Sequence, residues 1–295
     1  MQERRLLIIG LGYSGSCVAR AALRAGFDVS GTSRRAEAVP PPGVRLLAFA
    51  QAAPAIAAAT HLLATAPPHH DGDAAEGVDP AWAAHGAAIA SAPLLRWAGY
   101  LSTTGVYGDR QGGWVDEATP PRPEQERSRR RLAAEQAWAA LGARMPVDLF
   151  RIAGIYGPGR SALDDLRAGR ARRVIRPGHM FCRIHRDDIA AAVLAAMGQA
   201  RGPGVRVLNL ADDEPAGSAA VMEEAARLLG LPPPPAVPYA EVAPSLSPMA
   251  RSFWQESRLV ASARTQAELG LVWRYPSYRE GLRAILAAER EHGAA

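Results

Sequence analysis

A glycine-rich turn that follows a short apolar segment near the start of the chain constrains the fold most. Residues 6–9 are Leu-Leu-Ile-Ile, which is typical of a buried strand. The turn after them places Gly10, Gly12 and Gly15 in the spacing G-x-G-x-x-G, and residues 16–25 carry apolar side chains at helical intervals. A strand, a glycine turn and a helix in this order are typical of a βαβ unit that binds a dinucleotide.

Each glycine of the turn is needed for a different physical reason. Gly10 permits the tight turn, Gly12 lets a pyrophosphate approach the backbone, and Gly15 lets the helix pack closely against the strand. The pyrophosphate would lie at the positive end of the helix. The residues expected to bind the cofactor here are Gly10, Gly12, Tyr13, Ser14 and Gly15. The alternatives are an ordinary strand-to-helix turn or a signal peptide, whose apolar run the glycines interrupt too early.

The end of the next expected strand indicates which cofactor is bound. Residues 27–32 form this strand, and Ser33, Arg34 and Arg35 follow it. A fold that prefers NAD usually has an acidic residue there, which bonds the ribose hydroxyls. Guanidinium groups instead suit the 2′-phosphate of NADP. We therefore predict NADP, with NAD as the alternative cofactor if these arginines are only solvated surface charges.

Apolar segments alternate with helical patterns along most of the chain, which predicts an α/β fold. Further strands are expected at 44–50, 61–65, 97–102, 147–152 and 205–210, and helices at 54–59, 79–92, 124–141, 163–168, 187–197, 218–229 and 277–288. The prediction is a Rossmann-type doubly wound, mainly parallel sheet with a smaller C-terminal substrate lobe. Residues 1–159 form the dinucleotide-binding domain, completed by elements within 183–212, and 160–295 are mainly the substrate lobe. Three small residues at one strand end, Ala64, Thr65 and Ala66, are expected to let the cofactor lie close.

Composition excludes several classes of function. No apolar run approaches the roughly 20 residues that cross a bilayer, so a cytoplasmic protein without membrane contact is expected. The two cysteines, Cys17 and Cys182, are far apart and lack ligand spacing, which predicts neither a disulfide nor a metal site. The loop 69–77 contains two histidines and two aspartates, but without a second ligand group it is interpreted as a polar surface loop.

The basic residues bear on nucleic-acid binding and on catalysis. The formal charge is +5, but the arginines are scattered, and the densest run, 127–131, begins an expected helix. Nucleic acid is therefore not an expected partner. The chain contains no lysine, so any mechanism that needs a lysine amine is excluded.

Four motifs occur in order along most of the chain: residues 100–109 with Val-Tyr-Gly, 151–159 ending in Tyr-Gly-Pro-Gly, 184–190 with His-Arg-Asp-Asp, and 209–215. Together with the glycine turn, they resemble the extended short-chain dehydrogenase/reductase superfamily, which includes NAD-dependent epimerases and dehydratases. This resemblance implies an oxidoreductase or epimerase that acts on a small polar metabolite such as a nucleotide sugar. It also implies that Thr103 carries the catalytic hydroxyl.

The sequence departs from this family at the proton-transfer motif. The family's Tyr-x-x-x-Lys aligns with Arg127 and Arg131, and no tyrosine lies between Tyr107 and Tyr156. Arginine does not release a proton near neutral pH, so Arg127 cannot be the base, although Arg131 can still hold the nicotinamide ribose. The resemblance extends to atypical members of the family that often lose these catalytic residues.

The sequence leaves alternatives for the proton donor and for the type of function. Tyr107, Tyr156, Asp109 and His185 are candidate proton donors, each with an ordinary structural role as the alternative. Of these, Tyr107 is placed with Thr103 among the candidate catalytic residues. The whole chain is either an NADP-dependent enzyme or a catalytically silent NAD(P)-binding sensor or interaction protein. By analogy with the family, the helices at 80–92 and 124–141 are expected to form a homodimer.

Overall fold

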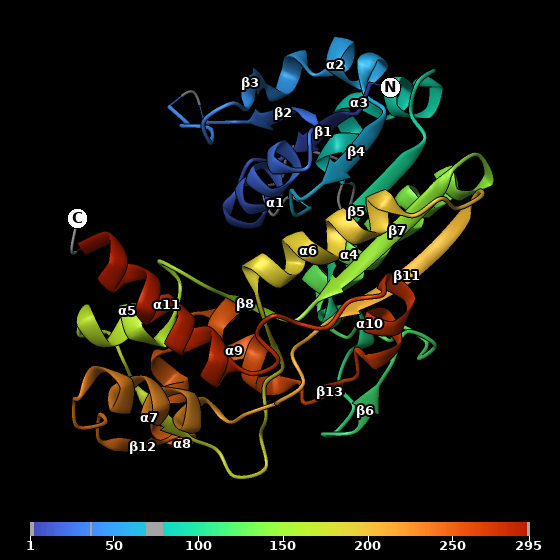
Figure 1. The fold of residues 1–295 in the computed structure, drawn as a ribbon. Coiled ribbons are helices and arrows are strands. Elements are labelled where there is room, and N and C mark those ends of the chain that lie inside the picture. The colour runs from blue at the N-terminus through green and yellow to red at the C-terminus, as the bar shows by residue number, and fades with distance from the viewer. Residues whose placement is uncertain (1–2, 36, 69–78, 294–295) are drawn as a thin grey trace.

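A parallel sheet of seven strands forms the centre of the computed structural model, which describes residues 3–35, 37–68 and 79–293 (Figure 1). Its strands are β1 (Arg5–Ile9), β2 (Asp28–Ser33), β3 (Arg45–Ala48), β4 (His61–Ala64), β5 (Trp97–Thr103), β7 (Pro146–Ile152) and β11 (Gly204–Leu210). The spatial order is β11-β7-β5-β4-β1-β2-β3. The predicted doubly wound sheet is confirmed, and the strand order reverses between β1 and β4, where such sheets bind ligands.

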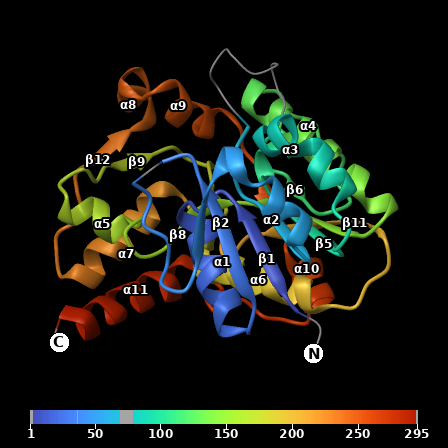
Figure 2. The ribbon, with the colours of Figure 1, turned by 90° about the horizontal axis from the view of Figure 1, so that it is seen from above.

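Helices cover both faces of this sheet (Figure 2). One face carries α1 (Tyr13–Arg24) and α6 (Arg186–Gly198), and the other carries α2 (Ala53–Ala58), α3 (Pro80–Ser91) and α4 (Glu126–Ala139). In β1, Leu6 and Ile8 belong to the first core, whereas Leu7 and Ile9 belong to the second. This double coverage explains why β1 and β4 have nearly continuous apolar sequences instead of alternating polar and apolar residues.

The second lobe is built mainly from helices. It contains α5 (Ala162–Arg167), α7 (Ser218–Leu229), α8 (Tyr239–Val242), α9 (Pro248–Gln255) and α11 (Tyr278–Gly293), with β9 (Arg173–Ile175) paired to β12 (Ala236–Pro238). Two parallel strand pairs lie beside the main sheet: β8 (Gly154–Tyr156) with β10 (Arg183–His185), and β6 (Trp114–Val115) with β13 (Leu259–Val260). The chain passes between the two parts more than once: α6, β11 and α10 (Ala263–Leu269) follow or separate segments of the lobe but pack with the sheet domain.

Local signals explain where individual elements begin. The Asp79 carboxylate accepts hydrogen bonds from the backbone N–H groups of Ala81 at 2.9 Å and Trp82 at 3.2 Å, and Pro80 occupies the first helical position of α3. The loop 69–77, interpreted as a polar surface loop, lies outside the described residues.

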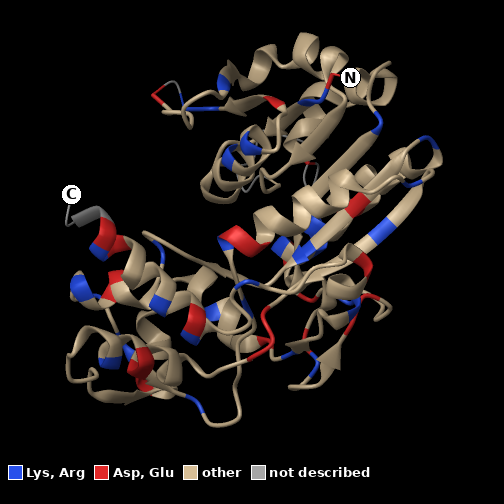
Figure 3. Cartoon of the chain, in the orientation of Figure 1, with Lys and Arg blue, Asp and Glu red and all other residues tan. Residues whose placement is uncertain are grey.

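Charged residues are distributed over both parts of the molecule. Figure 3 shows basic segments of the sheet domain and of the lobe intermingled with acidic ones. Within the described ranges, every helix is too short or too polar to cross a bilayer.

Candidate functional site

The carboxyl ends of β1, β2 and β4 meet around a cavity of about 1010 Å³. Parallel register places Ile9 beside Thr32 on one side and beside Ala64 on the other, so the turns after these strands share one edge of the sheet. Among the predicted cofactor residues, the cavity lining contains Gly10, Gly12, Tyr13, Ser33, Arg34, Arg35, Thr65 and Ala66. Ser14 and Gly15 lie directly behind this lining, in the first turn of α1.

The glycine turn has the form of a dinucleotide cradle. Gly10 has a φ of +105°, which L side chains rarely adopt, and a Cβ at Gly15 would collide with the carbonyl oxygen of Gly10. A Cβ at Gly12, in contrast, would meet no atom of the described chain within 4 Å, so the cradle is open there. No described side chain caps the N-terminus of α1. These residues fit a pyrophosphate, whose charge suits free N–H groups at a helix N-terminus.

Tyr13 connects this cradle to the loop after β8. Its hydroxyl donates a hydrogen bond to the carbonyl oxygen of Pro158 at 3.1 Å. The guanidinium groups of Arg186 and Arg160 lie 4.9 and 5.8 Å from the centre of its ring. Burial raises the pKa of Tyr13, although both arginines oppose this shift, so the hydroxyl stays protonated at neutral pH. Tyr13 is therefore a fixed donor that joins two sequence motifs.

At the end of β4, only part of the predicted set of cofactor residues, Ala64, Thr65 and Ala66, faces the cavity. Thr65 donates from its hydroxyl to the carbonyl oxygen of Gly10, which braces the glycine turn. Ala64, by contrast, is 1% exposed and belongs to the core on the α3 and α4 side. The prediction that Ala64 contacts the cofactor is wrong for this reason, whereas Thr65 and Ala66 line the cavity.

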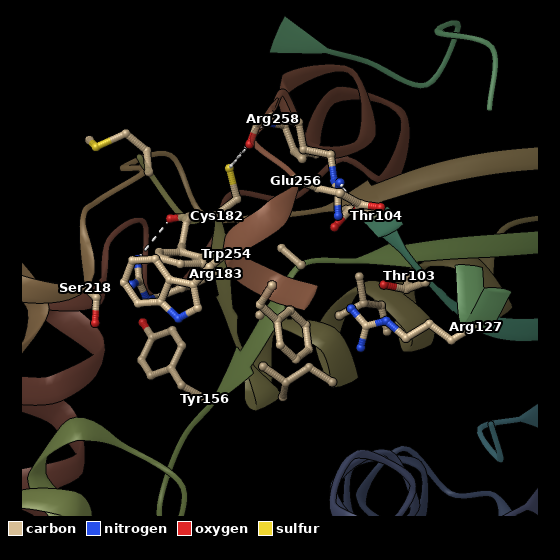
Figure 4. Close-up of a pocket in the computed structure, with 18 residues that line it drawn as sticks. Thr103, Thr104, Arg127, Tyr156, Cys182, Arg183, Ser218, Trp254, Glu256 and Arg258 are labelled. Carbon is tan, nitrogen blue, oxygen red and sulfur yellow. Dashed lines mark hydrogen bonds and ion pairs between the residues drawn. The ribbon is translucent and has the colours of Figure 1, made fainter. Parts of the chain in front are cut away.

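Two smaller cavities continue from the cofactor cavity toward the lobe. One of about 500 Å³ shares Arg34 and Pro67 with the cofactor cavity, and the next, of about 400 Å³, shares Thr103 and Arg127 with the 500 Å³ cavity. Figure 4 shows Thr103, Thr104 and Arg127 at one end of the 400 Å³ pocket, with the guanidinium of Arg127 directed toward its middle. The carboxyl edge of the sheet thus leads from the dinucleotide cradle to the residues aligned with the family's catalytic motif.

Buried polar contacts hold the end of β5 in place. Ser102 donates to the Glu135 carboxylate at 2.6 Å, and Arg151 binds the same carboxylate through Nε at 3.1 Å and Nη2 at 2.8 Å. Arg131 donates to the carbonyl oxygen of Leu101 at 2.7 Å and lies in the 500 Å³ cavity. This network fixes the backbone that carries Thr103, whose Oγ1 accepts from the N–H of Gly105 at 3.1 Å.

The rest of the 400 Å³ pocket, up to the end opposite Thr103 and Arg127, is formed by residues that sequence reasoning missed. They come from the segments 180–183 and 253–258 and from the start of α7, and include Met180, Phe181, Cys182, Arg183, Ser218, Phe253, Trp254, Glu256 and Arg258. Figure 4 shows Trp254, Arg183, Ser218 and Tyr156 together at this end. Burial raises the pKa of the Cys182 thiol to about 11, so it is not a nucleophile at neutral pH. The adjacent Phe-Trp pair in a polar stretch was the only sequence signal for this wall.

Three of the candidate proton donors have structural roles instead. Tyr107 is 0% exposed and donates to Asn209 at 2.7 Å, so its assignment as a catalytic residue is wrong. Asp109 accepts from the N–H of Ser257 at 2.7 Å and closes a turn. His185 is buried and its Nδ1 accepts from the N–H of Asp187 at 3.2 Å, capping α6.

Tyr156 is the candidate that does line the pocket. Its hydroxyl donates to the carbonyl oxygen of Ser277 at 3.3 Å, and burial raises its pKa strongly. A hydroxyl with a raised pKa holds its proton more tightly, so Tyr156 is a poor proton donor at neutral pH. The described residues contain no group of three or more His, Cys, Asp or Glu arranged to hold a metal ion.

Sequence comparison finds distant curated relatives, and no protein-family model matches the chain. The chain is 32% identical over 148 residues to a 3-diazoavenalumate denitrifying reductase of a Streptomyces species, over 45% of either chain. It is 29% identical over 180 residues to protein YeeZ of Escherichia coli K12, over 60% of this chain and 58% of that one. The chain therefore spans about half the length of the curated relatives it matches.

Structural comparison covers nearly the whole chain. A functionally unknown conserved protein from Silicibacter pomeroyi is 44% identical, with a TM-score of 0.88, and the match covers 97% of this chain and 99% of that one. MoeE5, solved with UDP-glucuronic acid and NAD, has a TM-score of 0.74 at 20% identity, over 98% and 99% of the two chains. The human epimerase family protein SDR39U1, solved with NADPH, has a TM-score of 0.71 at 19% identity, over 95% and 98%.

The glycine cradle and the cavity at the strand reversal define a Rossmann-type fold whose site fits a dinucleotide. The four motifs and the structural neighbours place it more narrowly. The chain has the fold of NAD(P)-dependent epimerases and reductases, and its four motifs resemble those of the extended short-chain dehydrogenase/reductase superfamily.

Proposed function

We propose that this protein is an NADP-dependent oxidoreductase or epimerase of the atypical extended type, acting on a polar metabolite such as a nucleotide sugar. The continuity of the cavities carries this proposal. The cofactor cavity adjoins the pocket of Thr103 through Arg34, and that pocket adjoins a further cavity of about 390 Å³ in the lobe through Tyr156, Arg183 and Ser218. A dinucleotide and an extended polar substrate can therefore meet at Thr103.

The end of β2 supports NADP over NAD. Arg34 and Arg35 are exposed at the cavity, and the backbone N–H of Arg35 donates to the Ser33 hydroxyl at 3.0 Å, which fixes the turn that presents them. Glu37 also lines this cavity, but it lies beyond the end of the strand where a ribose-binding carboxylate is expected. A guanidinium meets a phosphate with two parallel hydrogen bonds, so Arg34 suits the 2′-phosphate.

The residues around Thr103 define what the chain itself contributes to the reaction. When bound, a nicotinamide supplies or accepts a hydride. The hydroxyl of Thr103 lies at the wall of both substrate-side cavities, where it can bond a reacting oxygen. Arg127 can donate hydrogen bonds to that oxygen but cannot give up a proton near neutral pH. Loss of a general acid typically costs 10²–10⁴-fold in rate, so turnover of an ordinary nucleotide sugar is expected to be slower by about that factor than in a tyrosine-containing relative.

One observation favours a second candidate function. Arg127 occupies the position of the family's catalytic tyrosine, and the described lining of the two cavities that contain Thr103 includes no histidine. This arrangement suits a catalytically silent NAD(P)-binding sensor. A nucleotide-sugar panel with NADPH and NADP⁺, followed by absorbance at 340 nm and by chromatography of the sugars, separates the two candidates. An oxidoreductase changes the absorbance and an epimerase changes the sugar, whereas a sensor binds its ligands and changes neither.

Calorimetric titration of NADPH and NADH tests the cofactor assignment. One charged hydrogen-bond contact contributes about 1.5–3 kcal/mol, so the wild type is expected to prefer NADPH by roughly 10- to 150-fold. Arg34→Ala removes most of this preference, whereas Arg129→Ala, on the outer face of α4, leaves it intact. Equal affinities in the wild type, or a preference that survives Arg34→Ala, contradict the assignment.

The proposal also includes the location and the assembly expected from the sequence, a cytoplasmic homodimer that pairs through α3 and α4. The helices are exposed along one side of the sheet domain, where Figure 2 shows them adjacent. Sedimentation velocity at several protein concentrations distinguishes this dimer from a monomer.

A further inference from the structure

Arg127 is a cation in the wall of the substrate pocket, at the end that contains Thr103. It lies in the first turn of α4, lines both the 500 and the 400 Å³ cavities, and faces the space next to Thr103 (Figure 4). Its guanidinium packs 4.2 Å from the centre of the Phe253 ring, which projects from α9. One face of the guanidinium is thus covered by an aromatic ring, and its edge is left for hydrogen bonding.

The charges around Arg127 do not balance within the described chain. Its Nε donates to the Gln125 side-chain oxygen at 3.3 Å, and its two Nη atoms have no recorded partner among the described residues. Glu256, which lines the same pocket, already binds Arg258 at 2.6 Å. Burial lowers the pKa of Arg127, and Arg258 and Arg131 lower it further, while Glu256 opposes them. A half-buried cation without its own carboxylate is costly unless an anion joins it.

The rest of the pocket lining narrows the class of that anion. Beside Arg127 the lining combines the polar groups of Arg183, Ser218, Glu256 and Arg258 with the apolar side chains of Ile152, Met180, Phe181, Trp254 and Val260. A single planar guanidinium matches a planar carboxylate, which accepts two parallel hydrogen bonds from its fork. The apolar side chains of this lining can cover the faces of a flat ring or a sugar, while the fork of Arg127 is left for a carboxylate.

We infer that Arg127 is a specificity-determining residue that binds a carboxylate group of the substrate beside Thr103. This inference rests on the proposed function for the place of the substrate, and it goes beyond it by naming an acidic substrate. The replacement of tyrosine by arginine then exchanges a proton donor for an anion receptor. The protein selects a metabolite that carries a carboxylate near its reacting carbon.

Two matched ligand pairs test the inference in the NADPH-loaded protein. UDP-glucuronic acid and UDP-glucose differ in one carboxylate, and cinnamate and cinnamamide provide a pair that is independent of nucleotide sugars. Calorimetry measures affinity, and quenching of tryptophan fluorescence reports occupation of the pocket beside Trp254. The wild type is expected to bind the carboxylate of at least one pair about 10- to 150-fold more tightly than its neutral partner.

Substitutions in α4 distinguish a loss of carboxylate binding from a loss of folding. Arg127→Gln is expected to abolish the carboxylate preference, and Arg127→Lys, which keeps the charge without the planar fork, retains part of it. Arg129→Gln is the matched control, since its side chain is 53% exposed and paired with Glu126 on the outer face of the same helix. It keeps the full preference. Thermal unfolding of each variant confirms that the fold is intact.

The outcomes distinguish this inference from the proposed function. A preference for cinnamate without any binding of the UDP-sugars supports Arg127 as a carboxylate receptor and overturns the nucleotide-sugar class. Equal binding of the two UDP-sugars, unchanged in Arg127→Gln and without a cinnamate preference, overturns the carboxylate receptor and leaves that class standing. Absence of a carboxylate preference in both pairs, or a preference that Arg127→Gln retains, overturns the inference.

Discussion

Replacement of Arg151 by methionine is expected to destabilise the protein strongly, because it leaves the Glu135 carboxylate buried without a counter-ion. The two side chains are only 5% and 3% exposed, and Nη2 of Arg151 lies 2.8 Å from the carboxylate. Removal of one partner of a buried ion pair typically costs about 3–5 kcal/mol. Since whole domains are stable by only about 5–15 kcal/mol, this single change removes a large part of the free energy of unfolding.

Urea unfolding followed by circular dichroism measures the change in the free energy of unfolding. The double variant Glu135→Gln/Arg151→Met restores at least half of the loss, because the amide is uncharged and still accepts from Ser102. Arg264→Met provides the surface control: its pair with Glu268 lies on an exposed helix and is expected to contribute about 0.3–0.5 kcal/mol. The reasoning fails if Arg151→Met stays within about 1 kcal/mol of the wild type, or if the double variant is as unstable as the single one.

Three further predictions concern the cradle, a buried acid and the pocket. Gly12→Ala is expected to fold normally but to bind NADPH more weakly in calorimetry, whereas Gly15→Ala lowers the melting temperature, because only the second Cβ meets protein atoms. Burial raises the pKa of Asp212 to about 8, above its unfolded value of about 3.9, so the unfolding free energy falls as pH rises from about 4 to 8. Urea titrations should show that Asp212→Asn flattens this slope, by up to about 1.4 kcal/mol per pH unit. Thr103→Val is expected to lower turnover and leave NADPH affinity unchanged; unaltered turnover and ligand binding would make Thr103 a structural residue.

The layered fold could be predicted from sequence because its signals are local. Apolar runs marked the buried strands, and Asp79 followed by Pro80 marked the start of α3. The glycine turn predicted the cofactor cradle for the same reason, since strand, turn and helix adjoin in the chain. Ala64 shows the limit of this reasoning: it ends a strand at the correct edge, but its side chain points into the core.

The substrate pocket could not be predicted because distant segments build it. Phe253 reaches Arg127 from a helix more than a hundred residues away, and neither position lies in a periodic pattern. The motifs shared with the family also mislead about chemistry. Tyr107 and Asn209 belong to two of these motifs, and their side chains bond each other inside the core. Asp188, from a third, accepts from the backbone N–H of Arg274 at 2.8 Å. These residues maintain the fold. The resemblance of their motifs to those of the family is therefore stronger evidence of common ancestry than of a shared reaction.

The hydrogen bond from Tyr13 to Pro158 connects the cofactor cradle to the substrate cleft, so that binding at one can affect binding at the other. Tyr13 lines the cavity for the dinucleotide, while Gly159 and Arg160, directly after Pro158, line the cavity in the lobe. A dinucleotide that orders Tyr13 therefore also orders the loop that a substrate touches. Coupling between two binding equilibria is reciprocal, so any tightening of substrate binding by the cofactor equals the tightening of cofactor binding by the substrate.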